Sequence, residues 1–242
     1  MQSLEAELAE ARSLAVDELA DAIETIGFEC TRCGACCKSE ADDPHTATVF
    51  PDEVRRLQGA GDADGPTADT EESDAEGARD WRDVARPMPY GLTDGPDGPE
   101  GETFEWALQT DACGDCVFYE EDDDGVGACG VHADRPLICE TYPFSVALGG
   151  TSQPMGEAVD EEGVVRAHEC EGLGRDIDRA DAESLAAALK ERAVRELEEA
   201  IGVRDSYEPR TVDAGTVVVH DSEGAKDADG RPLDAAGRDD ER

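Results

Sequence analysis

Four cysteines fall within eight residues near the start of the chain, at Cys30, Cys33, Cys36 and Cys37. The first three follow C-x2-C-x2-C spacing, which lets one loop curl around an inorganic centre with three sulfurs directed inward, as in ferredoxin-type loops. The residues between the second and third cysteines are glycine and alanine, so backbone N–H groups can come close to the sulfurs. This stretch predicts a metal-thiolate site, and the rest of the chain is interpreted as its scaffold.

Cys36 and Cys37 are adjacent, which restricts how the four thiols can share a metal. Neighbouring side chains diverge by about 100° on a helix and point to opposite faces of a strand. Both thiolates are therefore strained as ligands of one mononuclear ion, and the sequence predicts a second site or a polynuclear centre. A helix starting near Cys33 would instead place Cys33 and Cys37 on one face. The sequence alone leaves these arrangements open.

The charge of the chain limits its partners. Among 242 residues, 61 are acidic and 21 are basic, which gives a formal net charge of −40. Such a surface repels nucleic acid and anionic membranes, so neither is expected as a partner, while a protein partner stays open. Lysine is scarce and the acids are spread along the chain, which favours a halophile's cytosol, where salt screens the self-repulsion. The alternative is an ordinary acidic protein with disordered acidic segments.

The hydropathy and the first residues predict a cytoplasmic protein. No stretch approaches the length of a membrane span, and the N-terminal residues carry acids where a signal peptide carries basic residues. Thiols inside the cell remain reduced. The nine cysteines of the chain are therefore expected to bind metal rather than to form disulfides.

The expected fold class is α+β, a small metal-stapled domain of short strands and loops flanked by two amphipathic helices. Apolar residues recur at helical spacing over residues 3–26, with Gly27 as the end of that helix, and again over residues 182–201, with Asp181 as the N-cap. The expected parts are an N-terminal helix packed on the core (1–27), a cysteine-cluster metal-binding domain (28–174), a C-terminal helix (175–202) and a mostly disordered acidic tail (203–242). Residues from about 59 to 80 lack periodicity and are expected to form a flexible acidic insertion.

Five more cysteines follow downstream, at Cys113, Cys116, Cys129, Cys139 and Cys170. A tetrahedral all-thiolate site uses four ligands, so nine cysteines furnish two sites with one thiol over. The upstream and downstream sets can mix, in which case metal binding ties the fold together and the metal-free protein is loose.

Few basic residues lie near these cysteines, and each has an expected role. Arg32, Lys38 and Arg135 lie in or beside the two clusters, where they can offset the charge of a thiolate centre. Chance placement is the alternative. His132 follows Cys129 at C-x2-H spacing, which fits a Cys/His zinc site, although an exposed or core histidine is the more common case.

The ordered motifs C-x2-C-x2-C-C, C-x-F-Y, C-x-V-H-x2-R-P-x2-C, Y-P-F and C-x-G-x-G resemble the YkgJ-like cysteine-cluster family. The resemblance covers roughly residues 28–174 and implies a zinc- or iron-chelating domain related to the flagellin lysine N-methylases. It also implies eight metal-ligating cysteines, which leaves Cys113 as the extra thiol. The matched positions are Cys30, Cys33, Cys36, Cys37, Cys116, Cys129, Cys139 and Cys170.

Three functions compete on this evidence. The first is a metal-centre protein with an iron-sulfur cluster, expected to be of the 4Fe-4S type, that acts in electron transfer, sensing or cluster handling, with structural Zn²⁺ as the alternative. The second is a protein-lysine N-methylase, which rests on the resemblance, since no glycine-rich strand-to-helix turn is evident. The third is a redox-active dithiol at Cys113 and Cys116, although a strand-like segment follows where a helix is expected.

Overall fold

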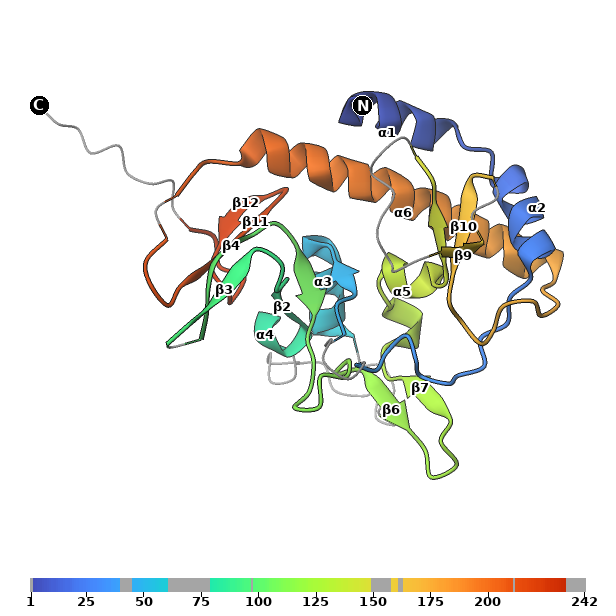
Figure 1. Ribbon diagram of the computed structural model, residues 1–242, viewed down its shortest axis with the longest axis horizontal. Coiled ribbons are helices and arrows are strands. Elements are labelled where there is room, and N and C mark those ends of the chain that lie inside the picture. The colour runs from blue at the N-terminus through green and yellow to red at the C-terminus, as the bar shows by residue number, and fades with distance from the viewer. Residues whose placement is uncertain are drawn as a thin grey trace, which may run out of the picture.

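The longest element of the computed structural model is α6 (Arg179–Ser206), a 28-residue helix that crosses the whole molecule (Figure 1). The structure describes residues 2–39, 45–60, 79–96, 98–148, 158–160, 163–210 and 212–233. The Asp178 side chain caps α6 by accepting a hydrogen bond from the Asp181 backbone N–H at 2.9 Å. The expected C-terminal helix is thus present, but it begins at Arg179 with Asp178 in place of Asp181 as its N-cap.

The N-terminal segment forms two helices, α1 (Leu4–Ser13) and α2 (Val16–Ile26). Lys190 of α6 donates a hydrogen bond from Nζ to the backbone oxygen of Leu14 at 2.7 Å, at the break between them. That contact supplies a partner for a carbonyl that a continuous helix would have bonded itself. The prediction of one helix over residues 3–26 is therefore wrong, whereas α2 ends at Gly27 as expected, with φ +76°.

A first hydrophobic core lies where α1 and α2 pack on α6 (Figure 1). A three-stranded antiparallel sheet closes it, in the order β8 (Phe144–Val146), β10 (Val165–His168), β9 (Ala158–Asp160). Ile23, Phe144 and Leu189 are almost fully buried there. This core holds the chain just before Cys30 and just before Cys170, which fixes two entry points to the cysteine region.

A second hydrophobic core surrounds Trp106, which is 1% exposed. Its antiparallel sheet has the order β1 (Thr48–Val49), β5 (Trp106–Leu108), β2 (Ala85–Pro87). Two helices complete it, α3 (Pro51–Gly59) and α4 (Trp81–Val84). Cys116 belongs to this core, and Cys37, Cys129 and Cys139 pack against it. The second core therefore adjoins one cysteine of the upstream loop and three of the five downstream cysteines.

The tail forms part of a four-stranded sheet, in the order β12 (Gly224–Lys226), β11 (Val217–Asp221), β4 (Gly98–Thr103), β3 (Leu92–Gly95). The parallel pairing of Val219 with Thr103 buries Val219 completely. In place of a mostly disordered tail, the segment after α6 thus has regular strands, because distant β4 supplies a pairing edge. Residues 234–242 of the expected tail, and residues 61–78 of the expected insertion, lie outside the described residues.

The remaining elements belong to the cysteine region: β6 (Tyr119–Glu121), β7 (Gly127–Cys129), the 3-10 helix η1 (His132–Asp134) and α5 (Leu137–Thr141). The β6–β7 hairpin projects from the end of the molecule opposite α6, and α5 lies between them (Figure 1). Helices and small sheets are mixed throughout, so the α+β prediction is confirmed. Among the described helices, none has the length and apolar character that crossing a bilayer requires.

Candidate metal centre

The first half of the cysteine loop is paired with the chain that follows Cys170. Phe28 and Leu173 form an antiparallel bridge, and the Glu29 backbone N–H donates to the Gly172 oxygen at 3.0 Å. The Gly172 N–H in turn donates to Cys170 Sγ at 3.4 Å. These contacts hold Cys30 and Cys170 in adjacent segments, although 139 positions separate them in the sequence.

The second half of the loop is paired with the segments that carry Cys116 and Cys129. The Cys116 backbone N–H donates to the Cys37 oxygen at 2.8 Å, and the Gly127 N–H donates to the Arg32 oxygen at 2.8 Å. Gly34 lies against the ring of Tyr119, where its φ of +75° and the lack of space exclude a larger side chain. The loop is thus held by β6 and β7 on this side.

Burial and mutual repulsion raise the pKa of the thiols nearest the second core. Burial raises the pKa of Cys139 well above the usual range, and the neighbouring Cys116, Cys36 and Cys129 raise it further. The pKa of Cys116 rises to about 11, chiefly through burial and then through Cys129. These thiols are therefore close enough to interact electrostatically. They stay protonated at neutral pH unless a cation compensates their charge.

A second group of thiols interacts around Cys170. Burial raises the pKa of Cys170, and the charges of Cys33, Cys36 and Cys30 add to the effect. Tyr142 lies beside the same group: burial raises its pKa to about 12, with Cys170, Cys36 and Cys33 as the next causes. The Tyr142 hydroxyl donates to the Glu169 backbone oxygen, so this ring anchors the residue before Cys170.

Cys36 stands between the two groups. Its Sγ lies 3.8 Å from that of Cys37, and this contact is the largest cause of the raised pKa of Cys36. Within the described residues, no three metal-ligating side chains converge closely enough to hold an ion as they stand. Binding a metal therefore requires the thiols to draw together from these neighbouring positions.

The chemistry of the donor set fits zinc or iron. The thiols of the eight predicted ligands are free, and none is engaged in a disulfide. Thiolate is the soft ligand that selects zinc and iron-sulfur centres over calcium or magnesium. A metal takes over the charge compensation that these crowded thiols lack, because it displaces their protons on binding.

Arg135 is a basic residue whose charge acts on two of the thiols. It lowers the pKa of both Cys36 and Cys129, and its Nη1 lies 2.8 Å from Nε2 of His132. Lys38 instead pairs with Glu121 and lies over the Tyr119 ring. The expected compensating role thus has structural support for Arg135, while His132 is engaged with that arginine.

Two residues near the thiols were missed by sequence reasoning. Glu53 of α3 is 2% exposed, and its Oε1 accepts a hydrogen bond from the Leu137 backbone N–H at 3.0 Å, at the start of the helix that carries Cys139. His45 is buried, which lowers its pKa, while the backbone of Cys36 acts in the opposite direction. The available signal in the sequence is the Pro-Asp-Glu run over residues 51–53, which is typical of a first helical turn with acids near the positive end of the helix dipole.

Cys113 lies apart from these interactions. Cys113 is exposed. Its backbone N–H donates to Asp111 Oδ1 at 2.8 Å, and its backbone oxygen accepts from Ser39 Oγ at 2.9 Å. Cys116, the other member of the suggested redox dithiol, is buried. The two thiols of that pair therefore differ sharply in access to solvent.

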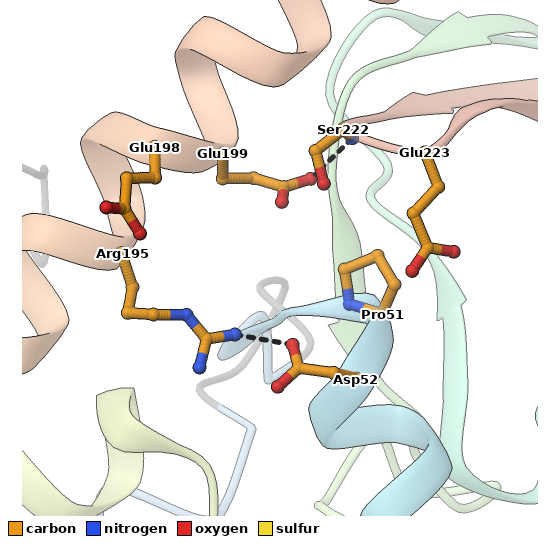
Figure 2. A pocket seen from close by; sticks show the side chains of 7 residues that line it. All are labelled: Pro51, Asp52, Arg195, Glu198, Glu199, Ser222 and Glu223. Carbon is orange, nitrogen blue, oxygen red and sulfur yellow. Dashed lines mark hydrogen bonds and ion pairs between the residues drawn. The ribbon is translucent and has the colours of Figure 1, made fainter.

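A small hollow of about 190 Å³ lies elsewhere, between α3, α6 and the turn that joins β11 to β12 (Figure 2). No cysteine lines it. Arg195 pairs with Asp52 across it, and Glu199 accepts a hydrogen bond from the Ser222 backbone N–H at 2.8 Å. Its polar groups thus satisfy one another, and the thiol region stays the candidate site.

Comparison with known proteins supports the same region. Neither the curated proteins nor the solved structures contain a significant match. The model of the family named CxxCxxCC, described as a "putative zinc- or iron-chelating domain", matches residues 29–171. The matched range covers more than half of the chain and includes all nine cysteines. The chain therefore belongs to the CxxCxxCC family of cysteine-cluster domains.

Proposed function

We propose that this protein is an iron-sulfur protein, with a cluster of the 4Fe-4S type that serves electron transfer, sensing or cluster handling. The observation that carries the proposal is that eight thiols from five separated parts of the chain lie in neighbouring positions around the Cys36–Cys37 pair. No short-range motif explains that convergence. Bound metal does, because an inorganic centre needs several soft ligands in one place.

The C-x2-C-x2-C spacing favours iron-sulfur over zinc, because three ligands from one tight loop suit a cubane cluster. Backbone donors support the same choice, since hydrogen bonds to sulfur tune such clusters. The Gly172 N–H already lies 3.4 Å from Cys170 Sγ. When bound, a cluster supplies one-electron transfer.

The residues proposed to hold metal are Cys30, Cys33, Cys36, Cys37, Cys116, Cys129, Cys139 and Cys170. The remaining protein groups would shield and compensate the thiolates. Cys116 is buried in the second core and Cys139 packs against it, which excludes water from one side. Arg135 offsets negative charge near Cys36 and Cys129.

Structural zinc is the second candidate, favoured by one observation. Cys116 is buried in the second core and Cys139 packs against that core, as expected for ligands of a closed tetrahedral zinc site. No feature of the described residues favours a lysine methylase, and we do not propose that activity.

The deciding experiment is purification of the full chain without oxygen and in concentrated salt, followed by analysis of iron, zinc and labile sulfide and by a visible spectrum. Iron with sulfide and a broad absorption near roughly 400 nm would support the iron-sulfur proposal. Zinc with a colourless solution would replace it with the structural-zinc candidate. Protein that is folded, free of metal and unable to take up zinc or reconstituted clusters would overturn both.

A further inference from the structure

The backbone contacts divide the cysteine loop into two halves with different partners. The half that begins at Phe28 is hydrogen-bonded to the segment after Cys170, through Glu29 to Gly172 and through Gly27 to Gly174. The same neighbourhood is seen in the electrostatics, since Cys33, Cys36 and Cys30 are the thiols that act on Cys170. Cys36 also acts on Cys116, Cys129 and Cys139, so the electrostatics place it beside both groups. The backbone pairing of Glu29 with Gly172 is what places Cys30 next to Cys170.

The half that ends at Lys38 faces the other way. The Cys116 backbone N–H donates to the Cys37 oxygen at 2.8 Å, and the Cys37 side chain packs against the core that contains Cys116. Cys129 and Cys139 pack against this same core. The four cysteines of this second group come from the loop, the segment before β6, the end of β7 and helix α5.

The adjacent pair is the point of division. Backbone hydrogen bonds from Cys37 and Lys38 to the Gly34 oxygen, at 2.8 and 3.0 Å, place Cys36 and Cys37 in one helical turn. Neighbouring side chains diverge by about 100° in such a turn. Cys36 is exposed, while Cys37 is half-buried against the second core. One member of the pair is therefore available to each group.

We infer that the eight thiols form two separate four-thiolate centres that meet at Cys36 and Cys37. The first centre uses Cys30, Cys33, Cys36 and Cys170, and the second uses Cys37, Cys116, Cys129 and Cys139. The inference rests on the proposed metal-binding function and adds the division of ligands. It also resolves the strain of adjacent ligands, since the two thiolates bind different ions or clusters.

The two centres should differ in stability toward chelators. The first contains the exposed Cys30 and Cys36, whereas the second contains Cys116, 7% exposed, and the partly buried Cys37, Cys129 and Cys139, which pack against the second core. Water and chelator reach the first centre more readily. Metal is therefore expected to leave in two stages, from the first centre and then from the second.

The experiment uses the wild-type metal-loaded protein, so no variant has to fold. A chelator is added in steps, and each sample is treated with an alkylating reagent whose sites are located by mass spectrometry while the remaining metal is measured. We expect Cys30, Cys33, Cys36 and Cys170 to become reactive together at half loss of metal, and the other four together at full loss. Cys113 is the internal control and should react from the start.

Paired substitutions test the assignment of Cys36 and Cys37 directly. The double variant Cys33→Ser/Cys36→Ser should keep half of the metal, because both changes fall in one centre. Cys33→Ser/Cys37→Ser should keep none, because it damages both. Loss of all metal in the first variant with folded protein, or release of all eight thiols in a single step, would show one joint centre and overturn the division. Wild-type protein that never holds metal would instead refute the proposed function itself.

Discussion

Glu53 and Leu137 are joined by a buried hydrogen bond that links α3 to the helix carrying Cys139. The carboxylate Oε1 of Glu53 accepts from the Leu137 backbone N–H at 3.0 Å, and its Oε2 accepts from the Phe50 backbone N–H at 3.0 Å. Only 2% of the Glu53 side chain is exposed. A buried carboxylate with two backbone donors fixes the relative position of two segments, so Glu53 positions the start of α5 and with it Cys139.

Glu53→Ala should therefore destabilise the protein and weaken its hold on metal. The change leaves the Leu137 N–H buried without an acceptor, at a cost of about 1–3 kcal/mol in the free energy of unfolding. Glu53→Gln keeps the shape and one acceptor oxygen, so its loss should be intermediate. Denaturant unfolding and metal retention against a chelator measure the two effects. Asp52→Ala, which removes an exposed ion pair from the same helix, is the control with little expected effect. Equal behaviour of the Glu53 and Asp52 variants would contradict the positioning role.

Gly34→Ala should disrupt the cysteine loop. Gly34 has φ +75°, and an added Cβ would overlap the Tyr119 ring. A matched control is Gly125→Ala, because Gly125 has φ +79° with open space around the added Cβ. The control should lose only the cost of placing a Cβ on a left-handed backbone, about 1–2 kcal/mol in the free energy of unfolding. Gly34→Ala should lose more and should also lower the metal content measured by elemental analysis. Comparable losses in both variants would mean that Tyr119 does not confine the loop.

Acid should remove a stabilising contribution of Glu223. The hydrogen bond from Arg55, followed by Lys226, lowers the pKa of Glu223 from 4.5 to about 2. Because the folded-state pKa is depressed, the ionised group stabilises the fold above about pH 4.5, and this contribution is lost as the pH falls toward 2. The side chain is 42% exposed, so solvent screening keeps the effect small.

The measurement is the difference in unfolding free energy between wild type and Glu223→Gln across that pH range. The difference should shrink as the pH falls. Glu10→Gln, at an exposed position of α1, serves as the reference for the general effect of removing one charge. A difference that stays constant with pH would mean that Glu223 gains nothing from its partners.

Salt should stabilise the fold strongly. The chain carries 61 acidic and 21 basic residues, and salt shortens the Debye length from about 10 Å at 0.1 M to about 3 Å at 1 M. Repulsion among acids should therefore weaken and the free energy of unfolding should rise, as followed by circular dichroism in increasing KCl. A variant with Glu10→Gln and Glu18→Gln should show a shallower dependence. Unfolding that is insensitive to KCl would argue against adaptation to concentrated salt.

The two ends of the chain show which features of the fold sequence patterns can predict and which they cannot. Helical spacing correctly predicted where the N-terminal and C-terminal helical segments lie in the sequence, because periodicity is a local property. It did not predict the break at Leu14, since the acceptor there is satisfied by Lys190 from a helix far along the chain. Similarly, the tail was expected to be mostly disordered, but β11 pairs there with β4, which lies more than a hundred residues earlier.

The candidate site shows the same difference between what the sequence predicts and what the tertiary structure decides. The cysteine spacings indicated a metal-thiolate site, because short-range spacing determines which ligands one loop can present, and the resemblance to the YkgJ-like family implied which eight thiols are the candidates and set Cys113 apart. Only the tertiary structure decided that Cys170 lies beside Cys30 and Cys33, that Cys37 faces Cys116, and that Glu53 holds the start of the Cys139 helix. The physical reason is that long connecting segments leave the relative placement of the two clusters free. Two hydrophobic cores and backbone hydrogen bonds between distant segments then fix that placement.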